Sequence, residues 1–384
     1  MRIAYLHGGS IPSFFANGVH VMRMCDAFTA AGHDVTLYTA PGTDAYADLD
    51  PYEYYGVRHR FALRFLPYTE NTPTGYWKRA EQVRELLIRD TVPDLVYGRD
   101  PYSLARAADL APFVYEVHQV RKDVAPPWTE HELFARPLLA RVVAITHALA
   151  RDLQDIHHGL GPLPVLVAPD CADPPDPGTA VSAPDLPGRP DAPRIGYVGH
   201  LYNGRGIDLI LDLAGRLPGF DFHLVGGTAE DRARWEDPCP HPNVYFHGHL
   251  PPAALPGYFP LFDVVLAPYQ RKVYTWGGIE ETGRWASPMK LFEYMAHGRA
   301  IIASDLPVLH EVLQDRVNCL LRPPDQPQAW AEAVAELVAD LVLRRKLGDE
   351  ARRQFSQLYT WRRRADTVLA GLDLPHAPGT GGTL

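Results

Sequence analysis

The sequence predicts an α/β protein of two domains, each built on a parallel β-sheet with helices on both faces. Short apolar runs alternate with segments of helical periodicity along most of the 384 residues, a pattern typical of parallel sheets. A stretch rich in proline, aspartate and glycine, Pro174–Pro193, interrupts this rhythm, which then starts again. We therefore expect a first domain over residues 1–173, a linker or surface loop over 174–193, and a second domain over 194–358.

The expected strands are short apolar runs, and helices fill the gaps between them. In the first domain we expect strands at Arg2–Leu6, Asp34–Thr39, Asp94–Tyr97, Phe113–Val117, Val142–Ile145 and Val165–Val167, with helices such as Val19–Ala31 and Lys78–Arg89. In the second we expect strands at Arg194–Val198, Asp221–Val225, Val244–Phe246, Val264–Ala267, Ala300–Ala303 and Cys319–Leu321. A terminal segment over 359–375, with a helix at Thr360–Leu372, is expected to pack back on the first domain, before a disordered tail over 376–384.

Composition restricts the compartment and the partners. The net charge of -9 argues against a general nucleic-acid binder. Four widely spaced cysteines form no metal motif and indicate reduced thiols in a cytoplasmic protein. The N-terminus reads as a strand instead of a signal peptide, and no apolar run approaches the about 20 residues of a membrane span. The oligomeric state is left open.

The segment Ser287–Pro307 predicts an anion site at the start of a helix. Ser287 is a natural N-cap, Pro288 suits the first helical position, and Gly298 ends the helix. Lys290 in the first turn opposes the helix dipole, so free amides and a lysine would together attract phosphate. Glu293 lies three residues on, on the same face, where a carboxylate suits sugar hydroxyls. The segment therefore indicates a sugar nucleotide.

Glycine-rich loops after several strands are the next candidates. The loop in Tyr197–Gly206 carries three glycines and Arg205, whose fork of donors suits phosphate. A solvated arginine is the plain alternative, but Lys290 supplies a second cation in the same domain. Gly8 and Gly9, after the first strand, would let amides approach a ligand. Gly226–Gly227 and Gly248 could pack against a base or ribose, and tight turns explain them equally well.

His118 ends the strand Phe113–Val117, at the sheet edge where ligands bind. It could donate a hydrogen bond to a substrate hydroxyl or leaving-group oxygen, although most of the 17 histidines must be structural or solvated. Glu116 should share its face and could orient it or serve structure. In Trp276–Trp285, the acids Glu280 and Glu281 and the nearby arginine could contact a sugar, or the segment is a mobile surface loop.

Several of these segments resemble glycosyltransferase family 4, the retaining, nucleotide-sugar-dependent enzymes of the GT-B fold. The resemblance rests on six segments: Asn17–Phe28, Ala31–Val35, Val142–Leu149, Val167–Asp173, Gly199–Gly206 and Phe292–Gly298. It implies two Rossmann-like domains facing a central cleft. The Ser-Pro-Met-Lys-Leu-Phe-Glu-Tyr-Met helix is similar to that of a recognised subgroup.

The resemblance also implies residue roles. Arg205, at the usual lysine position, and His200, at the usual arginine, would hold the donor diphosphate, and Glu293 the ribose hydroxyls. His118 would contact the reacting sugar and its leaving group. Amides near Gly8, Gly9, Gly227 and Ser287 would meet phosphates or sugar. Family members commonly carry a glutamate where this chain has Trp285, so Glu281 or backbone amides would take over sugar recognition.

The predicted function is retaining transfer of a sugar from a nucleotide-diphosphate sugar to an acceptor hydroxyl, with no cofactor and no metal ion. Glycan, lipid-linked and natural-product acceptors all remain open, and a lipid-linked acceptor would bring the protein to a membrane surface. A sugar-nucleotide epimerase on the same fold would need further cleft carboxylates. A non-catalytic sugar-nucleotide-binding partner would bind donor without turnover.

Overall fold

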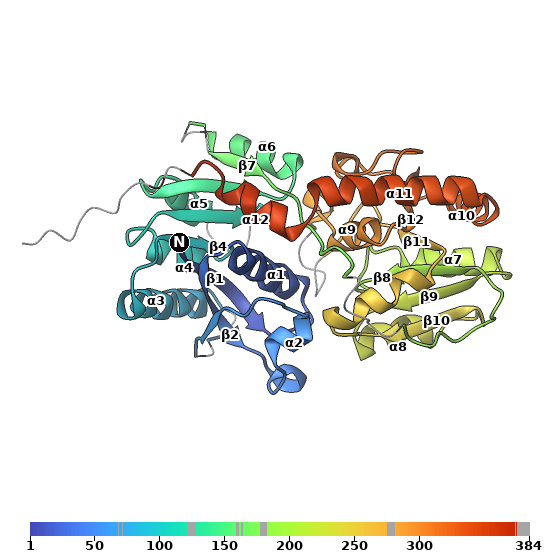
Figure 1. The fold of residues 1–384 in the computed structure, drawn as a ribbon, viewed down its shortest axis with the longest axis horizontal. Coiled ribbons are helices and arrows are strands. Elements are labelled where there is room, and N and C mark those ends of the chain that lie inside the picture. Colours follow the sequence, from blue (N-terminus) through green and yellow to red (C-terminus); the bar gives the residue numbers. More distant parts are fainter. Residues whose placement is uncertain are drawn as a thin grey trace, which may run out of the picture. The chain divides into compact units, whose positions relative to one another are not determined.

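The structure, a computed structural model, describes residues 1–67, 69–70, 72–120, 127–158, 161–162, 164–176, 183–274, 281–372 and 374. The chain forms two compact units. Unit 1 contains Met1–Pro169 and the chain from Trp361 on, and unit 2 contains Asp170–Thr360. Each unit holds one parallel β-sheet with helices on its faces (Figure 1), which confirms the predicted fold class.

The sheet of unit 1 has the order β3-β2-β1-β4-β5-β6-β7, and all its pairs are parallel. Its strands are β1 (Arg2–Ile11), β2 (Asp34–Pro41), β3 (Ala62–Phe65), β4 (Leu95–Gly98), β5 (Phe113–Val117), β6 (Leu139–Ala144) and β7 (Val165–Val167). The strand order reverses between β1 and β4. In open α/β sheets such a reversal leaves a ligand crevice beyond the carboxyl ends of the two strands.

Seven α-helices are described in unit 1: α1 (Ala16–Ala30), α2 (Pro51–Tyr55), α3 (Pro73–Asp90), α4 (Pro101–Ala107), α5 (Pro127–Phe134), α6 (His147–Ile156) and α12 (Trp361–Leu369). The terminal helix α12 lies beside α1. Arg362 of α12 donates to the Ala30 carbonyl over 2.8 Å, and the Trp361 ring meets the edge of His20 at 5.1 Å between centroids. Residues far apart in sequence therefore meet on one face of the first sheet.

Unit 2 repeats the arrangement with the order β10-β9-β8-β11-β12-β13. Its strands are β8 (Arg194–Val198), β9 (Asp221–Val225), β10 (Val244–Gly248), β11 (Val264–Ala267), β12 (Ala300–Ser304) and β13 (Leu320–Arg322). Its α-helices are α7 (Ile207–Arg216), α8 (Ala229–Glu236), α9 (Met289–Ala296), α10 (Pro327–Ala339) and α11 (Leu341–Leu358). Here the order reverses between β8 and β11.

Apolar residues fill both faces of the second sheet. Along β11, Val265 and Ala267 pack into the layer of α9 and α11, whereas Val264 and Leu266 pack into the layer of α7 and α10. Because successive side chains of a strand point to opposite faces, a strand covered on both sides must be apolar throughout. This requirement explains why these strands are visible in the sequence as continuous apolar runs.

Two features of the first sheet differ from the prediction. β1 does not end at Leu6 but continues to Ile11, with a register shift against β2 between Leu6 and Ser10. Gly8 and Gly9 therefore lie in an irregular strand end, and the predicted turn there is wrong. β3 was not predicted, because this edge strand, Ala62–Phe65, is largely exposed and shows no apolar run.

The described part of the proline-rich segment belongs to unit 2. Leu186 is buried in the core, and the Arg189 guanidinium donates to Asp221 over 2.6 Å. The predicted tail over 376–384 lies outside the described residues.

All four cysteines are free thiols, and no described helix has the length and apolar character needed to cross a membrane.

Candidate functional site

Helix α9 places Lys290 in its first turn, as predicted. The helix begins at Met289, and its N-cap is Pro288 with no side-chain cap. The prediction that Ser287 caps it is wrong, because the Ser287 hydroxyl instead accepts a hydrogen bond from the Asp170 amide over 2.9 Å. Gly298 ends the helix with φ +59°, the left-handed conformation that favours glycine.

The Lys290 side chain is buried against aromatic rings. It is 9% exposed, and its Nζ has no hydrogen-bond partner among the described residues. Nζ lies 3.8 Å from the ring centre of Tyr197 and 5.3 Å from that of Tyr269. Aromatic faces attract a cation, but they do not replace the hydrogen bonds that an ammonium group makes in water.

Glycine permits Lys290 to approach the backbone after β8. Gly199 has φ +144°, and a Cβ atom there would lie 2.6 Å from Lys290 Nζ. A Cβ on Gly226 would overlap the Gly199 carbonyl. The same bare backbone that admits the lysine thus leaves the Gly199 region open to a ligand.

Arg205 lies in the loop between β8 and α7, close to the same aromatic side chain. Its guanidinium carbon is 5.3 Å from the Tyr269 ring centre, and its Nε has no partner among described residues. Gly204 and Gly206 hold the loop with φ +84° and +76°. Because β8 and β11 flank the reversal in strand order, Arg205 and Tyr269 lie where this fold places ligands.

The two cations act on each other. Burial, and then the Arg205 charge, lower the pKa of Lys290 well below its usual range, and Glu293 offsets part of this shift. Burial and the charges of Arg205, His249 and Lys290 likewise lower the pKa of His200 to about 3. An anion between Lys290 and Arg205 would relieve this repulsion. The sequence therefore predicted both cations, whereas the aromatic rings beneath them are visible only in the structure.

The other predicted site residues of unit 2 are Glu293, His200, Gly227 and Glu281, and their surroundings differ. Glu293 is half-buried on α9, one turn beyond Lys290. The His200 ring stacks on Tyr202 at 4.6 Å. Gly227 has φ +80°, and a Cβ there would lie 2.6 Å from the Leu201 side chain. Glu281 is exposed and pairs with Tyr274 in an isolated antiparallel bridge, and no described contact joins it to Lys290.

Glu280 and the rest of 275–280 lie outside the described residues.

A pocket of about 540 Å³ borders the loop between β8 and α7, on the side of α7, between Tyr202, Trp235 and Gln270. The side chains that line it include neither Lys290 nor Arg205. The candidate donor site therefore rests on the charged cluster and not on this pocket.

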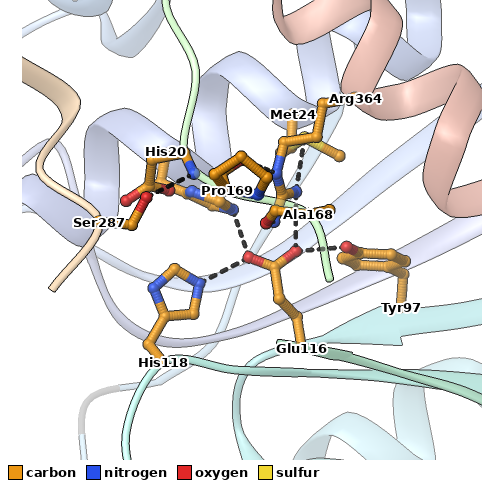
Figure 2. A network of polar contacts seen from close by, with 10 residues as sticks. His20, Met24, Tyr97, Glu116, His118, Ala168, Pro169, Ser287 and Arg364 are labelled. Carbon is orange, nitrogen blue, oxygen red and sulfur yellow. Dashed lines mark hydrogen bonds and ion pairs between the residues drawn. The ribbon is translucent and has the colours of Figure 1, made fainter. Parts of the chain in front are cut away.

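In unit 1, a buried carboxylate organises the second cluster (Figure 2). Glu116 is 1% exposed, and its Oε1 accepts from His118 Nε2 at 2.6 Å. His20 Nε2 lies 2.6 Å from the same oxygen. Arg364 donates to Oε2 over 3.1 Å, and the Tyr97 hydroxyl donates a short hydrogen bond to that oxygen.

These partners fix the charge of Glu116. Burial alone would raise its pKa, but Arg364 and His20 together hold the pKa of Glu116 well below its usual range. Arg364 also donates to the carbonyls of Pro169 and Ala168 over 2.8 and 3.1 Å. Removing one member of such a buried pair leaves the other charge uncompensated and costs about 3–5 kcal/mol.

The same network fixes the tautomer of His118. Burial and the Arg99 charge lower the pKa of His118 to about 3, so the ring is neutral at pH 7. Because the ionised Glu116 can only accept, His118 Nε2 carries the proton, and Nδ1 is left as an acceptor. The structure thus favours acceptance of a substrate hydrogen bond by His118, where the sequence predicted donation.

His20, Glu116 and His118 each offer one possible ligand atom within 4.8 Å of the others, as metal ligands can. However, both nitrogens are 2.6 Å from one oxygen, the length of a charge-assisted hydrogen bond. Ligands that share a zinc ion each bond to the metal at about 2.0–2.2 Å and lie farther apart. The geometry is that of His118 hydrogen-bonded to the carboxylate and of His20 in close polar contact with the same oxygen.

Gly8 and Gly9 lie over buried polar side chains of unit 1. A Cβ on Gly9 would lie 2.7 Å from His7 Nε2, and one on Gly8 would lie 3.1 Å from Arg79 Nη2. No pattern in the sequence points to Arg364, which follows Glu116 by 248 positions, or to His20. His20 could have been noticed only as a histidine on the buried face of the first helix.

Comparisons with known proteins agree with this architecture. The protein-family model described as "Glycosyltransferase Family 4" matches residues 18–176. The model described as "Glycosyl transferases group 1" matches residues 192–340. A protein named as the teichuronic acid biosynthesis glycosyltransferase TuaH of Bacillus subtilis is 28% identical over 114 residues, or 29% of this chain. That match spans only 27% of the relative's own length.

Solved structures match over nearly the whole chain. Sucrose-phosphate synthase of Thermosynechococcus elongatus has a TM-score of 0.69 at 18% identity, with 96% of this chain and 97% of the other covered. HepE of Anabaena, in complex with UDP-glucose, has a TM-score of 0.63 at 16% identity and coverage of 97% and 100%. At such identities these likenesses show the fold. Together with the two family matches, which cover most of the sequence, they show that this chain belongs to the glycosyltransferases of the GT-B fold.

Proposed function

We propose that the protein transfers a sugar from a nucleotide-diphosphate sugar to an acceptor hydroxyl, with retention at the anomeric carbon. The observation that carries the proposal is Lys290, a buried cation without a hydrogen-bond partner in the described structure. A second cation, Arg205, lies over the same tyrosine ring. A diphosphate would supply negative charge and the acceptor oxygens that Lys290 Nζ and Arg205 Nε lack among the described residues.

The same groups would promote departure of the nucleotide. As the bond from sugar to phosphate breaks, negative charge grows on the diphosphate, and preorganised cations in a dry site stabilise that charge. Glu293 would accept hydrogen bonds from the ribose hydroxyls. His118, held by Glu116, would accept a hydrogen bond from a hydroxyl of the transferred sugar and so fix its position.

Retention and the absence of a metal requirement belong to the same proposal. The acceptor hydroxyl would attack from the face that the nucleotide leaves, and a phosphate oxygen would take its proton. This mechanism requires no carboxylate as a covalent nucleophile. Anomeric configuration of the product, read by NMR coupling constants, tests retention directly, and turnover in excess EDTA tests the metal requirement.

The first experiment is incubation of the protein with UDP-, GDP- and ADP-sugars while free nucleotide is measured. Slow hydrolysis of one donor that is lost in Lys290→Met supports the proposal. Hydrolysis that is equal in both proteins would remove Lys290 from the donor site. An arginine exposed on α6, Arg151, provides a matched control as Arg151→Gln.

A non-catalytic donor-binding protein is the second candidate, and Trp285 is the observation that favours it. By the resemblance to family 4, this tryptophan takes the place of a glutamate, and the exposed Glu281 makes no described contact with Lys290. Such a protein would bind one nucleotide sugar by calorimetry and release no nucleotide from it, with or without any acceptor.

A further inference from the structure

Arg99 follows β4 directly, at the reversal in strand order of unit 1. The register places Leu6, Gly98 and Tyr115 side by side on β1, β4 and β5. The Arg99 amide donates to the Leu6 carbonyl over 3.3 Å, and the paired part of β1 and β4 ends there. The Arg99 side chain therefore starts from the crevice position of this sheet.

Strand alternation brings three side chains to one face at this edge. Tyr97 packs against Phe28 of α1, so the face of Tyr97 is the face that α1 covers. Alternation carried one residue past the paired positions would place Arg99, His7 and His118 on that same face. The Arg99 charge lowers the pKa of both histidines, as expected from a cation close to each of them.

Arg99 has no acid to pair with among the described residues. The buried acids at this edge already have arginine partners: Arg79 lies 3.3 Å from Asp100, and Arg364 lies 3.1 Å from Glu116. Arg99 is half-buried, and no described carboxylate forms an ion pair with it. Within the described part of a chain whose net charge is -9, this positive charge therefore has no ion-pair partner.

The imidazole of His7, beside Arg99, is neutral and has a nitrogen that can donate a hydrogen bond. Burial and the charges of Arg99 and Arg79 lower the pKa of His7 to about 3. His7 is 4% exposed, and its Nε2 has no partner among described residues. The first turn of α1 has no side-chain cap and no acid, and His20, one turn further on, touches His118. A cation and a neutral imidazole with an unpartnered nitrogen, together with an uncapped helix start, suit an anion.

We propose that this edge of unit 1 binds an anionic group, phosphate or carboxylate, of the sugar acceptor. Arg99 forms the ion pair with that group, His7 donates to it, and His118 lies beside the hydroxyl to be glycosylated. The assignment to the acceptor rests on the proposed transferase function, in which Arg205 and Lys290 hold the donor diphosphate. The class of acceptor is thus a sugar phosphate, a uronic acid or a phosphate-linked glycan.

The test uses glucose 6-phosphate and glucose as a charged and an uncharged probe of one size. Saturation-transfer NMR on the full-length protein should detect saturable binding of glucose 6-phosphate, competition by inorganic phosphate, and no binding of glucose. Arg99→Gln should weaken binding at least about 10-fold, as loss of a charge-assisted contact does. Arg151→Gln is the control. Ring signals of His7 and His118 should shift in the wild type when glucose 6-phosphate is added.

Three outcomes would overturn the proposal: equal binding by Arg99→Gln, unshifted histidine signals, or binding of glucose as strong as that of its phosphate. Saturating UDP separates the two sources of the anion. Displacement of glucose 6-phosphate by UDP would assign the site to the donor diphosphate, and simultaneous binding supports the acceptor. Failure of the transferase proposal looks different, because no donor would then be hydrolysed while phosphate binding still depended on Arg99.

Discussion

Lys290→Met is the perturbation that separates donor binding from folding most clearly. Methionine keeps the length and apolar stem of lysine and removes only the charge. A unit charge about 4 Å from a phosphate oxygen contributes at most about 4 kcal/mol at an effective dielectric constant near 20. Measured losses for charged hydrogen bonds are about 1.5–3 kcal/mol. We therefore expect UDP affinity to fall about 10- to 150-fold, if UDP is the nucleotide that the wild type binds.

Stability should move in the opposite direction. Lys290 Nζ is buried without a hydrogen-bond partner among the described residues, so folding removes an ammonium group from water with only ring faces as compensation. The free energy of unfolding of Lys290→Met should stay equal or rise by about 1 kcal/mol. Urea unfolding of both proteins measures this change.

Proton uptake on UDP binding gives a third measurement, from the same calorimetric titrations that measure the affinity. Burial and Arg205 depress the pKa of Lys290 in the free protein, and a bound diphosphate would raise it again. Binding should therefore take up protons, seen by calorimetry as an enthalpy that depends on the buffer, and affinity should weaken as pH rises. Unchanged affinity with unchanged proton uptake in Lys290→Met would refute the phosphate role. A large loss of stability would make the lysine structural.

Four further outcomes are expected. His118→Ala should lower turnover more than donor affinity, and normal turnover in steady-state assays would end its assignment to the reacting sugar. Gly199→Ala should cost about 1–3 kcal/mol of stability because of its positive φ, and should weaken nucleotide binding because its methyl group displaces Lys290; calorimetry at equal affinity would contradict this. Glu116→Gln should destabilise by about 3 kcal/mol or more, since the buried Arg364 charge loses its carboxylate partner, whereas the exposed Glu85→Gln should change little in the same urea unfolding. Because the pKa of His7 is about 3 when folded and about 6.5 when unfolded, its contribution to stability is complete above pH 6.5 and is lost toward pH 3, by up to about 1.4 kcal/mol per pH unit; a wild type and a His7→Gln variant with the same pH slope would contradict this.

Most of the strands could be predicted because each sheet is covered on both faces. A strand such as Val264–Ala267 has apolar layers on either side, so its composition alone identifies it. The edge strand Ala62–Phe65 was not predicted, because it is largely exposed to solvent and has no apolar run. The end of β1 was misjudged because glycines are compatible with a turn and with an irregular strand alike.

The sequence by itself determined the fold class and the positions of Lys290 and Arg205, because these follow from local rules: apolar periodicity, a helix start and a glycine-rich loop. The tertiary structure decided what surrounds them. The tyrosine faces under Lys290, the pairing of Glu116 with Arg364 at the far end of the chain, and the lack of an acid for Arg99 among the described residues all depend on segments distant in sequence. The charge states at both candidate sites come from burial and from those long-range neighbours, and no pattern along the chain encodes them locally.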